Sequence, residues 1–228
     1  MDTIEWLCAL IFAAAWLGYE PVMARIGTHH TTINADLAHI RAAWMVRMLA
    51  REGRIMDTNL IGHVLNSASF FASTNLLIMA AAAGLLFGGE AALARLNGLA
   101  VLAKAPSWLL ELKFTLVVIT LGRGLLDFIW AIRQLNYCVS LLGAAPEAGE
   151  SDRHKRYASA IAGALNPALS AFNRGVRAYY FAMAAAAWLI AGWAMALGAL
   201  ASFALLAWRQ LYSDAALATR RARQVLEE

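Results

Sequence analysis

Five polar or charged side chains recur at helical spacing in the apolar stretch over residues 108–142. They are Lys113, Thr120, Arg123, Asp127 and Gln134. At 100° of rotation per residue, all five fall within a sector of about 80°, so they form one stripe along a single helix face. Charged groups at bilayer depth are costly and usually face a bundle interior or a water-filled cavity. The stripe therefore predicts an intramembrane polar network or the lining of a path.

Within this stripe, Arg123 and Asp127 lie four residues apart and can contact each other on one face. In a low dielectric such a pair can form two parallel hydrogen bonds, and removing one partner costs about 3–5 kcal/mol. One hypothesis is that this pair is structural and fixes the helix to its neighbours. A second is that the pair and Lys113 border an ion or proton path. A third is that this segment is not a true span. Gly122 and Gly124 predict close helix approach or a local break.

A second polar stripe lies upstream and contains Asn66, Ser69 and Ser73, with Asn59 and His63 nearby on the same face. Hydroxyl and amide groups inside a bundle usually form hydrogen bonds between helices. The stripe is therefore interpreted either as such a contact between helices or as the wet lining of a permeation path. The two interpretations differ in whether the stripe meets protein or water.

The elements that position these stripes are predicted from composition and hydropathy. Hydrophobic residues make up 61% of the 228 residues and charged residues only 15%, and mean hydropathy is +0.57. This exceeds what a soluble core of this size can bury. We expect an all-α polytopic membrane helix bundle forming one membrane domain over residues 1–228, with about four transmembrane helices. The predicted spans cover residues 4–23, 66–89, 108–142 and 178–208, and a tail follows over 209–228.

The connections predict two further cytoplasmic helices that are amphipathic. Apolar residues recur every three to four positions over residues 34–52, with Asn34 as the expected N-cap, and over residues 157–172, with Pro167 as an expected kink. The span over 178–208 is expected to continue without a break, because no proline or polar turn interrupts it. It is longer than a hydrocarbon core of about 30 Å requires, so we expect it to tilt or protrude.

Lysine and arginine counts predict the orientation of these spans. With four spans, the two long connections lie on one side and hold eleven Lys and Arg residues, against six on the other side. Cytoplasmic segments carry the excess of positive charge. We therefore expect the two long connections in the cytoplasm and both termini outside.

Several functional classes are disfavoured by the absence of their motifs. The basic residues flank apolar stretches, which is a membrane-orientation pattern, so no nucleic-acid partner is expected. Cys8 and Cys138 lie in apolar segments without metal-ligand spacing, and no metal, cofactor or catalytic residue is predicted. We expect no enzymatic activity, although a catalytic arrangement need not be local in sequence.

Three blocks of the sequence resemble the membrane protein family known as domain of unknown function 599. The resemblance implies a bacterial inner-membrane protein with about four spans, with uncharacterised members also in plants, and it implies no activity. The blocks comprise Ile33–Asn34, Arg41, Trp44, Met48, Arg51, Arg54–Ile55, Asp57 and Phe70–Asn75; then Leu112–Phe114 and Arg133–Tyr137; and finally Phe172–Phe181.

Two function hypotheses follow from the sequence. The first is an oligomeric channel for a small ion or solute in the lipid bilayer. In this channel, the charges of Lys113 and Arg123 would determine the electrostatic field in the path. Four helices barely enclose a path, so a homo-oligomer is expected. The alternative is a non-enzymatic scaffold or accessory subunit that binds a partner through residues 34–52 and 215–228.

Overall fold

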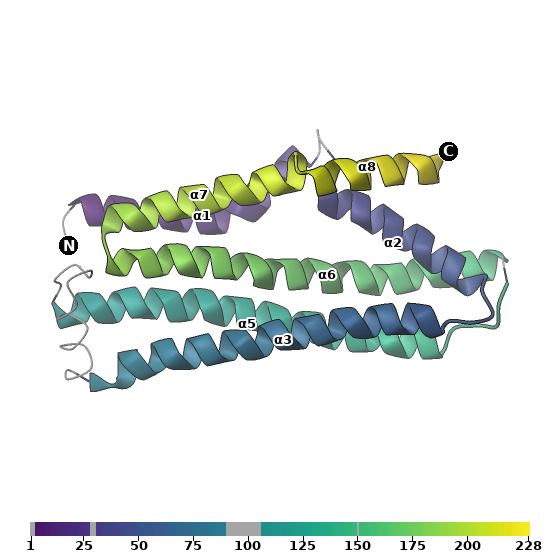
Figure 1. Ribbon diagram of the computed structural model, residues 1–228, viewed down its shortest axis with the longest axis horizontal. Helices are drawn as coiled ribbons and strands as arrows, with labels where there is room; N and C mark the ends of the chain where they lie inside the picture. Colours follow the sequence, from purple (N-terminus) through teal and green to yellow (C-terminus); the bar gives the residue numbers. More distant parts are fainter. Residues whose placement is uncertain (1–2, 28–30, 90–105, 150) are drawn as a thin grey trace. The chain divides into compact units, whose positions relative to one another are not determined.

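The regular secondary structure in the described part of the protein is helix alone. The computed structural model describes residues 3–27, 31–89, 106–149 and 151–228, and no strand occurs in these ranges. This confirms the predicted all-α fold class. In chain order the elements are α1 (Thr3–Ile26), α2 (Ile33–Leu49), α3 (Ile55–Phe87), α5 (Ser107–Gly143), α6 (Asp152–Ala186), the 3-10 helix η1 (Ala187–Leu189), α7 (Gly192–Leu211) and α8 (Asp214–Glu227) (Figure 1).

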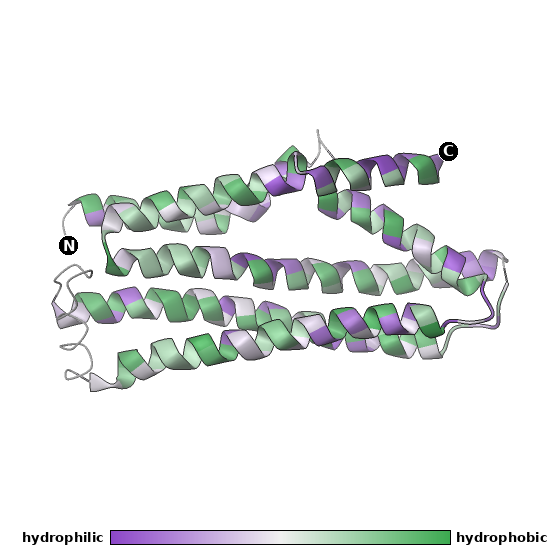
Figure 2. Ribbon diagram, viewed as in Figure 1, coloured by the Kyte–Doolittle hydropathy of each residue, from purple (hydrophilic) through white to green (hydrophobic). Residues whose placement is uncertain are grey.

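Four helical stretches are long and apolar enough to cross a bilayer. Figure 2 shows that hydrophobic residues dominate α1 and α7, whereas hydrophobic and hydrophilic residues alternate in α8. A helix needs about 20 mostly apolar residues to cross the hydrocarbon core, and all four stretches provide them. The protein is therefore a helical membrane protein. The stretches are Thr3–Ile26, Ile55–Phe87, Ser107–Gly143 and Gly192–Glu227.

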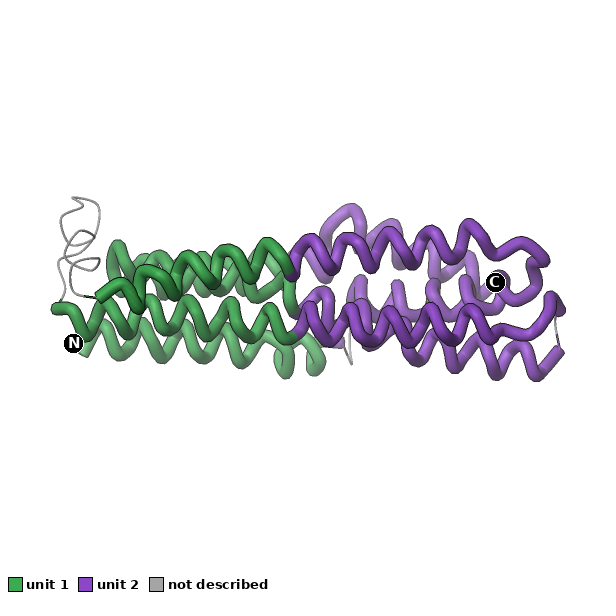
Figure 3. The backbone as a smooth tube through the Cα atoms, turned by 90° about the horizontal axis from the view of Figure 1, so that it is seen from below, with its two compact units in different colours: residues 1–26, 73–126, 175–207 green, residues 27–72, 127–174, 208–228 purple. Residues whose placement is uncertain are grey.

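The chain groups into two compact units, which Figure 3 draws in different colours. The long helices α3, α5 and α6 each contribute one segment to each unit. By sequence, unit 2 holds 13 of the 19 Lys and Arg residues and 10 of the 15 Asp and Glu residues. Most of the charged residues, of both signs, therefore belong to unit 2. Unit 1 comprises Met1–Ile26, Ser73–Leu126 and Gly175–Ala207, and unit 2 comprises Gly27–Ala72, Asp127–Arg174 and Trp208–Glu228.

Unit 1 is packed through aromatic and small side chains. Phe12 of α1 lies edge-on to Phe181 of α6, with ring centroids 6.4 Å apart. Tyr19 of α1 makes the same kind of contact with Phe203 of α7 at 5.4 Å. Most of the exposed large apolar side chains of the described residues belong to this unit. An apolar surface of this kind suits contact with lipid.

Unit 2 has its own hydrophobic core, to which α2, α3, α5 and α6 all contribute buried side chains such as Met48, Ile61 and Leu135. Three further aromatic rings form one cluster in this unit. Phe71 stacks on Phe128 at 5.9 Å, and Phe172 lies edge-on to both rings at 5.7 and 5.8 Å. Unit 2 therefore buries part of its apolar side chains in a core of its own.

The expectation of an uninterrupted helix over residues 178–208 needs correction. The helix α6 ends at Ala186, η1 forms a tight turn, and α7 begins at Gly192. The two helices form an antiparallel hairpin: a Cβ on Gly198 would lie 3.3 Å from Ala184, and Ser202 donates a hydrogen bond to the carbonyl oxygen of Tyr180. Small residues allow this close packing. The chain therefore reverses direction between α6 and α7 without a proline or a polar turn.

The predicted surface helices also differ in their limits. The helix predicted over 34–52 is α2, whose N-cap is Thr32, because Thr32 accepts a hydrogen bond from the backbone N–H of Ala35 at 3.4 Å. Asn34, the predicted cap, instead accepts a hydrogen bond from Asn173 at 3.0 Å. The helix predicted over 157–172 is an internal part of α6, which continues through Pro167. The span predicted over 66–89 belongs to α3, which begins earlier, at Ile55.

Candidate functional site: arginine and carboxylate pairs in unit 2

The polar stripe predicted on α3 lies on the exposed surface of the chain. Asn66, Ser69 and Ser73 are all exposed, as are Asn59 and His63. The opposite face of α3 is the buried one and carries Asp57, Ile61 and Asn75. Within a single chain, the stripe therefore lines no interior.

The residues of the stripe predicted on α5 have different surroundings in unit 1. Lys113 is buried, and its Nζ lies 5.8 Å from the centroid of the Trp188 ring. Thr120 is also buried, and its hydroxyl donates to the carbonyl oxygen of Leu116 in the same helix at 2.8 Å. Arg123 is exposed. Thr120 therefore has its hydrogen bond within the helix.

Asp127 and Gln134, the remaining residues of that stripe, belong to unit 2. Asp127 is buried and accepts a hydrogen bond from Nε of Arg174 at 2.9 Å. Gln134 is half-buried, and its Oε1 atom is buried. The contact of Asp127 with Arg174 is additional to the predicted pairing with Arg123. The sequence does not indicate it, because Arg174 lies 47 residues further along the chain, on α6.

Asp57 is a fully buried carboxylate that the site prediction omitted. It accepts hydrogen bonds from Nε1 of Trp44 at 2.6 Å and from Nη1 of Arg51 at 3.1 and 3.2 Å. Arg54 adds a further contact near Asp57, because it donates a hydrogen bond to the carbonyl oxygen of Pro146 at 2.6 Å. These contacts attach the end of α2 to the start of α3 and to the loop after α5.

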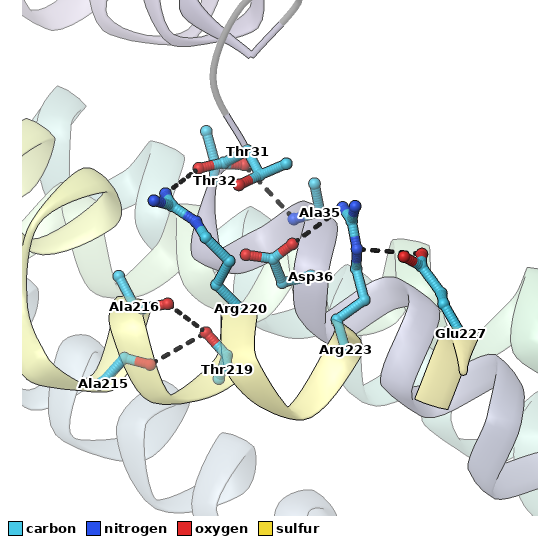
Figure 4. A network of polar contacts seen from close by, with 10 residues as sticks. All are labelled: Thr31, Thr32, Ala35, Asp36, Ala215, Ala216, Thr219, Arg220, Arg223 and Glu227. Carbon is cyan, nitrogen blue, oxygen red and sulfur yellow. Dashed lines mark hydrogen bonds and ion pairs between the residues drawn. The ribbon is translucent and has the colours of Figure 1, made fainter. Parts of the chain in front are cut away.

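Asp36 is a second fully buried carboxylate, and it attaches the C-terminal helix α8 to α2. Figure 4 shows Nη1 of Arg223 donating to Oδ1 of Asp36 at 3.1 Å, and Nε of Arg223 lies 3.1 Å from Glu227. Arg220 donates to the carbonyl oxygen of Thr31 at 3.0 Å. The buried residue of α8 is the small Ala216. The contact between the two helices therefore depends mainly on arginine.

A third set of contacts connects α2 to α6. Arg41 donates to Oδ1 of Asn166 at 2.8 Å, and Nδ2 of Asn166 donates to the carbonyl oxygen of Ala38 at 3.5 Å. Burial lowers the pKa of Arg41 from its ordinary value. The ordinary pKa of a guanidinium group lies so far above neutrality that Arg41 stays charged. This contact is therefore a charge-assisted hydrogen bond, which is stronger than one between neutral groups.

These contacts position helices, and they bring no ligand set together. Within residues 3–27, 31–89, 106–149 and 151–228, no three His, Cys, Asp or Glu side chains lie close enough to hold a metal ion. Asp36, Asp57 and Asp127 each accept a hydrogen bond from an arginine. The arrangement suits a rigid helical platform, because a buried carboxylate that is paired with arginine fixes the relative position of two elements.

Replacing Arg223 with alanine is expected to release α8. The change leaves the buried carboxylate of Asp36 without its arginine, at a cost of about 1–3 kcal/mol. Hydrogen exchange of the amides of Asp214–Glu227 should become markedly faster. Arg221→Ala is the matched control, because Arg221 lies on the exposed side of the same helix. Equal exchange rates in the two variants would show that Arg223 does not hold α8.

Several of the residues that make these contacts belong to the first sequence block. Asn34, Arg41, Trp44, Arg51 and Asp57 all lie in unit 2 and use their side chains in the hydrogen bonds between elements. The family model described as "Protein of unknown function, DUF599" matches residues 7–215. The chain belongs to the DUF599 family. It matches no curated protein and no solved structure. For this DUF599 member, the block residues therefore have a direct structural role in unit 2.

Proposed function

We propose that unit 1 crosses the membrane five times and that unit 2 lies in the cytoplasm. The crossing segments would be α1, α7 and the parts of α3, α5 and α6 that lie in or directly adjoin unit 1. The unit 1 segments of α3 and α6 are shorter than about 20 residues, so their crossings would include the adjoining turns of the same helices. Five crossings place the three chain segments of unit 2 on one side, where they hold 13 Lys and Arg residues. The connections on the other side hold Arg95 and Lys104. This charge difference is larger than that of the four-span arrangement, and cytoplasmic segments carry the positive excess.

This placement changes the expected position of one terminus. The N-terminus stays outside, whereas the C-terminus moves to the cytoplasm, because the α6–α7 hairpin adds one crossing. In the inner membrane of a bacterium, the N-terminus would face the periplasm.

Within this placement, the proposed function is that of a non-enzymatic scaffold or accessory subunit of a membrane complex. The observation that carries it is the paired state of the buried carboxylates of unit 2, each of which accepts a hydrogen bond from an arginine. Such a unit presents a rigid surface to a partner. The helices first considered for partner binding, over 34–52 and 215–228, use one face for contact with each other. A partner would therefore bind elsewhere on unit 2 or on their outer faces.

Site-specific photo-cross-linking in native membranes tests the scaffold function. We expect a photoreactive residue in place of Val225, which is 68% exposed on α8, to form a discrete adduct with another polypeptide. The matched control is Leu77, which is 72% exposed in unit 1 and should react with lipid. If no exposed position of unit 2 gives a protein adduct, the scaffold function is wrong.

A channel is the second candidate, and specific atoms of unit 1 favour it. The hydroxyl of Tyr19, Oδ1 of Asn75 and Nε1 of Trp188 are buried, and none has a hydrogen-bond partner among the described residues. Lys113 is buried beside Trp188. Buried polar atoms without protein partners are commonly satisfied by water. A hydrated interior of this kind, repeated in several copies around an axis, would provide a path.

Ion flux through proteoliposomes distinguishes the channel from the scaffold. If the protein conducts, Lys113→Ala should change the rate or the ion selectivity, because it removes the buried charge in unit 1. Lys155→Ala, which removes an exposed charge in unit 2, is the control. The absence of flux at every salt concentration, voltage and pH would contradict the channel.

A further inference from the structure

A cavity of about 260 Å³ lies in unit 2 where α2 ends and α6 begins. Val46, Arg47 and Ala50 line it from the end of α2, and Gly149, His154 and Lys155 line it from the loop and the start of α6. A water molecule occupies about 30 Å³ of liquid volume, so the cavity has room for a phosphate group with a small organic part.

Two cations at this cavity are available to a ligand. Arg47 is exposed, and it forms no hydrogen bond or ion pair with the described residues. Lys155 lies 4.0 Å from Asp152, but both side chains are largely exposed, at 67% and 89%. Water screens an exposed ion pair of this kind, so the pair is weak and Lys155 stays available to a ligand. An arginine fork together with a lysine is a common way of binding phosphate.

His154 forms two hydrogen bonds that fix its side chain in the cavity wall. Nε2 of His154 lies 2.8 Å from the carbonyl oxygen of Glu147, and Nδ1 lies 2.7 Å from the hydroxyl of Ser151. A carbonyl oxygen can only accept, so Nε2 carries the proton and donates it. The backbone N–H of Gly149 donates to the carbonyl oxygen of Leu49 at 3.1 Å, which attaches the loop to the end of α2. The wall is therefore formed before any ligand binds.

Gly149 lies close to the imidazole ring of His154. A Cβ there would lie 2.8 Å from Cε1 of His154. A side chain at residue 149 would displace the imidazole ring and change the shape of the wall. This gives a way to alter the cavity without removing a charge.

We propose that this cavity binds a phosphate group, with Arg47 and Lys155 as the two cationic contacts and with Gly149 and His154 as part of its wall. The site rests on the proposed binding function of unit 2 and gives it a ligand class. The phosphate could belong to a small soluble molecule or to a lipid headgroup, since both present the same oxygens to the two cations.

Titration of the full chain with inorganic phosphate in a nonionic detergent tests the site. We expect saturable binding that Arg47→Ala and Lys155→Ala each weaken by at least about tenfold, the loss of one good charge-assisted contact. Arg153→Ala removes an exposed cation of α6 that does not line the cavity, and it should leave the affinity unchanged. Gly149→Ala should weaken binding although it removes no charge. Arg47 forms no hydrogen bond or ion pair with the described residues, so its variant should keep the melting temperature of the original protein.

The absence of saturable binding would overturn the proposal, as would an equal loss in Arg153→Ala, which would indicate a nonspecific charge effect. Nanodiscs with neutral lipid and with phosphatidylglycerol distinguish the two sources. Competition by phosphatidylglycerol identifies a lipid headgroup, whereas an equal phosphate affinity in both nanodiscs identifies a soluble ligand. Detergent leaves both faces of the protein accessible, so this titration does not depend on the membrane orientation. Failure of the site is thereby distinguishable from failure of the scaffold function, which the cross-linking experiment tests.

Discussion

Replacing Gly124 with alanine is expected to destabilise unit 1 by about 1–3 kcal/mol, the usual cost of overpacking. A Cβ at this position would lie 2.6 Å from Cβ of Ala178 and 3.2 Å from Nδ2 of Asn75. The amide of Asn75 also donates to the carbonyl oxygen of Leu121 at 2.9 Å. The methyl group must therefore push α6 away from α5 and disturb a buried hydrogen bond.

Gly122→Ala is a sharp control for this variant. Both glycines lie in the same helix, and alanine favours the helical backbone by about 1 kcal/mol over glycine at either position. A Cβ on Gly122 would lie 3.7 Å from Sδ of Met79, an ordinary contact. We expect Gly122→Ala to keep or raise the melting temperature in detergent and Gly124→Ala to lower it. Equal melting temperatures would show that α5 and α6 do not approach closely at Gly124.

Replacing Asp57 with alanine is expected to destabilise unit 2 by about 3 kcal/mol. The change leaves Nε1 of Trp44 without its acceptor and removes the carboxylate that faces Arg51. Asp57→Asn keeps an oxygen for Trp44 but removes the charge, so an intermediate loss is expected. Thermal unfolding in detergent, combined with hydrogen exchange of the α2 amides, measures the effect.

The control for Asp57 is Asp152→Ala, which removes a carboxylate that is 89% exposed. An exposed ion pair contributes at most about 1 kcal/mol, so its loss should be small. If the two alanine variants unfold at the same temperature, the buried contacts of Asp57 do not stabilise unit 2.

The sequence predicts most of the helices, but it misplaces several of their limits. The first helix is predicted over residues 4–23 and observed over Thr3–Ile26, and it continues through Pro21. The N-terminal part of α3 was missed because Asp57, Asn59 and His63 resemble loop residues in a hydropathy profile. These residues belong to the unit 2 segment of the helix, where Asn59 and His63 are exposed and Asp57 is buried.

The break between α6 and α7 has a signal in the sequence that hydropathy alone does not show. The small residues Ala184 and Gly198 form the close contact of the hairpin. Residues 178–208 are longer than one crossing requires, and the sequence alone predicts that the helix tilts or protrudes. A turn explains the same length, because about 46 Å of helix exceeds a core of about 30 Å.

The candidate site was predictable only where its contacts are local. The pairing of Asp57 with Trp44 and Arg51 joins residues at most 13 positions apart. The pairing of Asp36 with Arg223 joins residues 187 positions apart, and helical periodicity carries no information about it. The prediction that Gly122 or Gly124 allows close helix approach is confirmed for Gly124. At Gly122, a Cβ atom would make only an ordinary van der Waals contact.

The most direct test of the account is the side of the membrane on which the C-terminus lies. Glu228→Cys and Ile190→Cys can be labelled in intact cells with a maleimide that does not cross the membrane. The natural cysteines Cys8 and Cys138 are buried and should not react in the folded protein. We expect Ile190→Cys to be labelled from outside, and Glu228→Cys only after the membrane is permeabilised. Labelling of Glu228→Cys in intact cells, with Ile190→Cys protected, would contradict the five-crossing arrangement and with it the cytoplasmic position of unit 2.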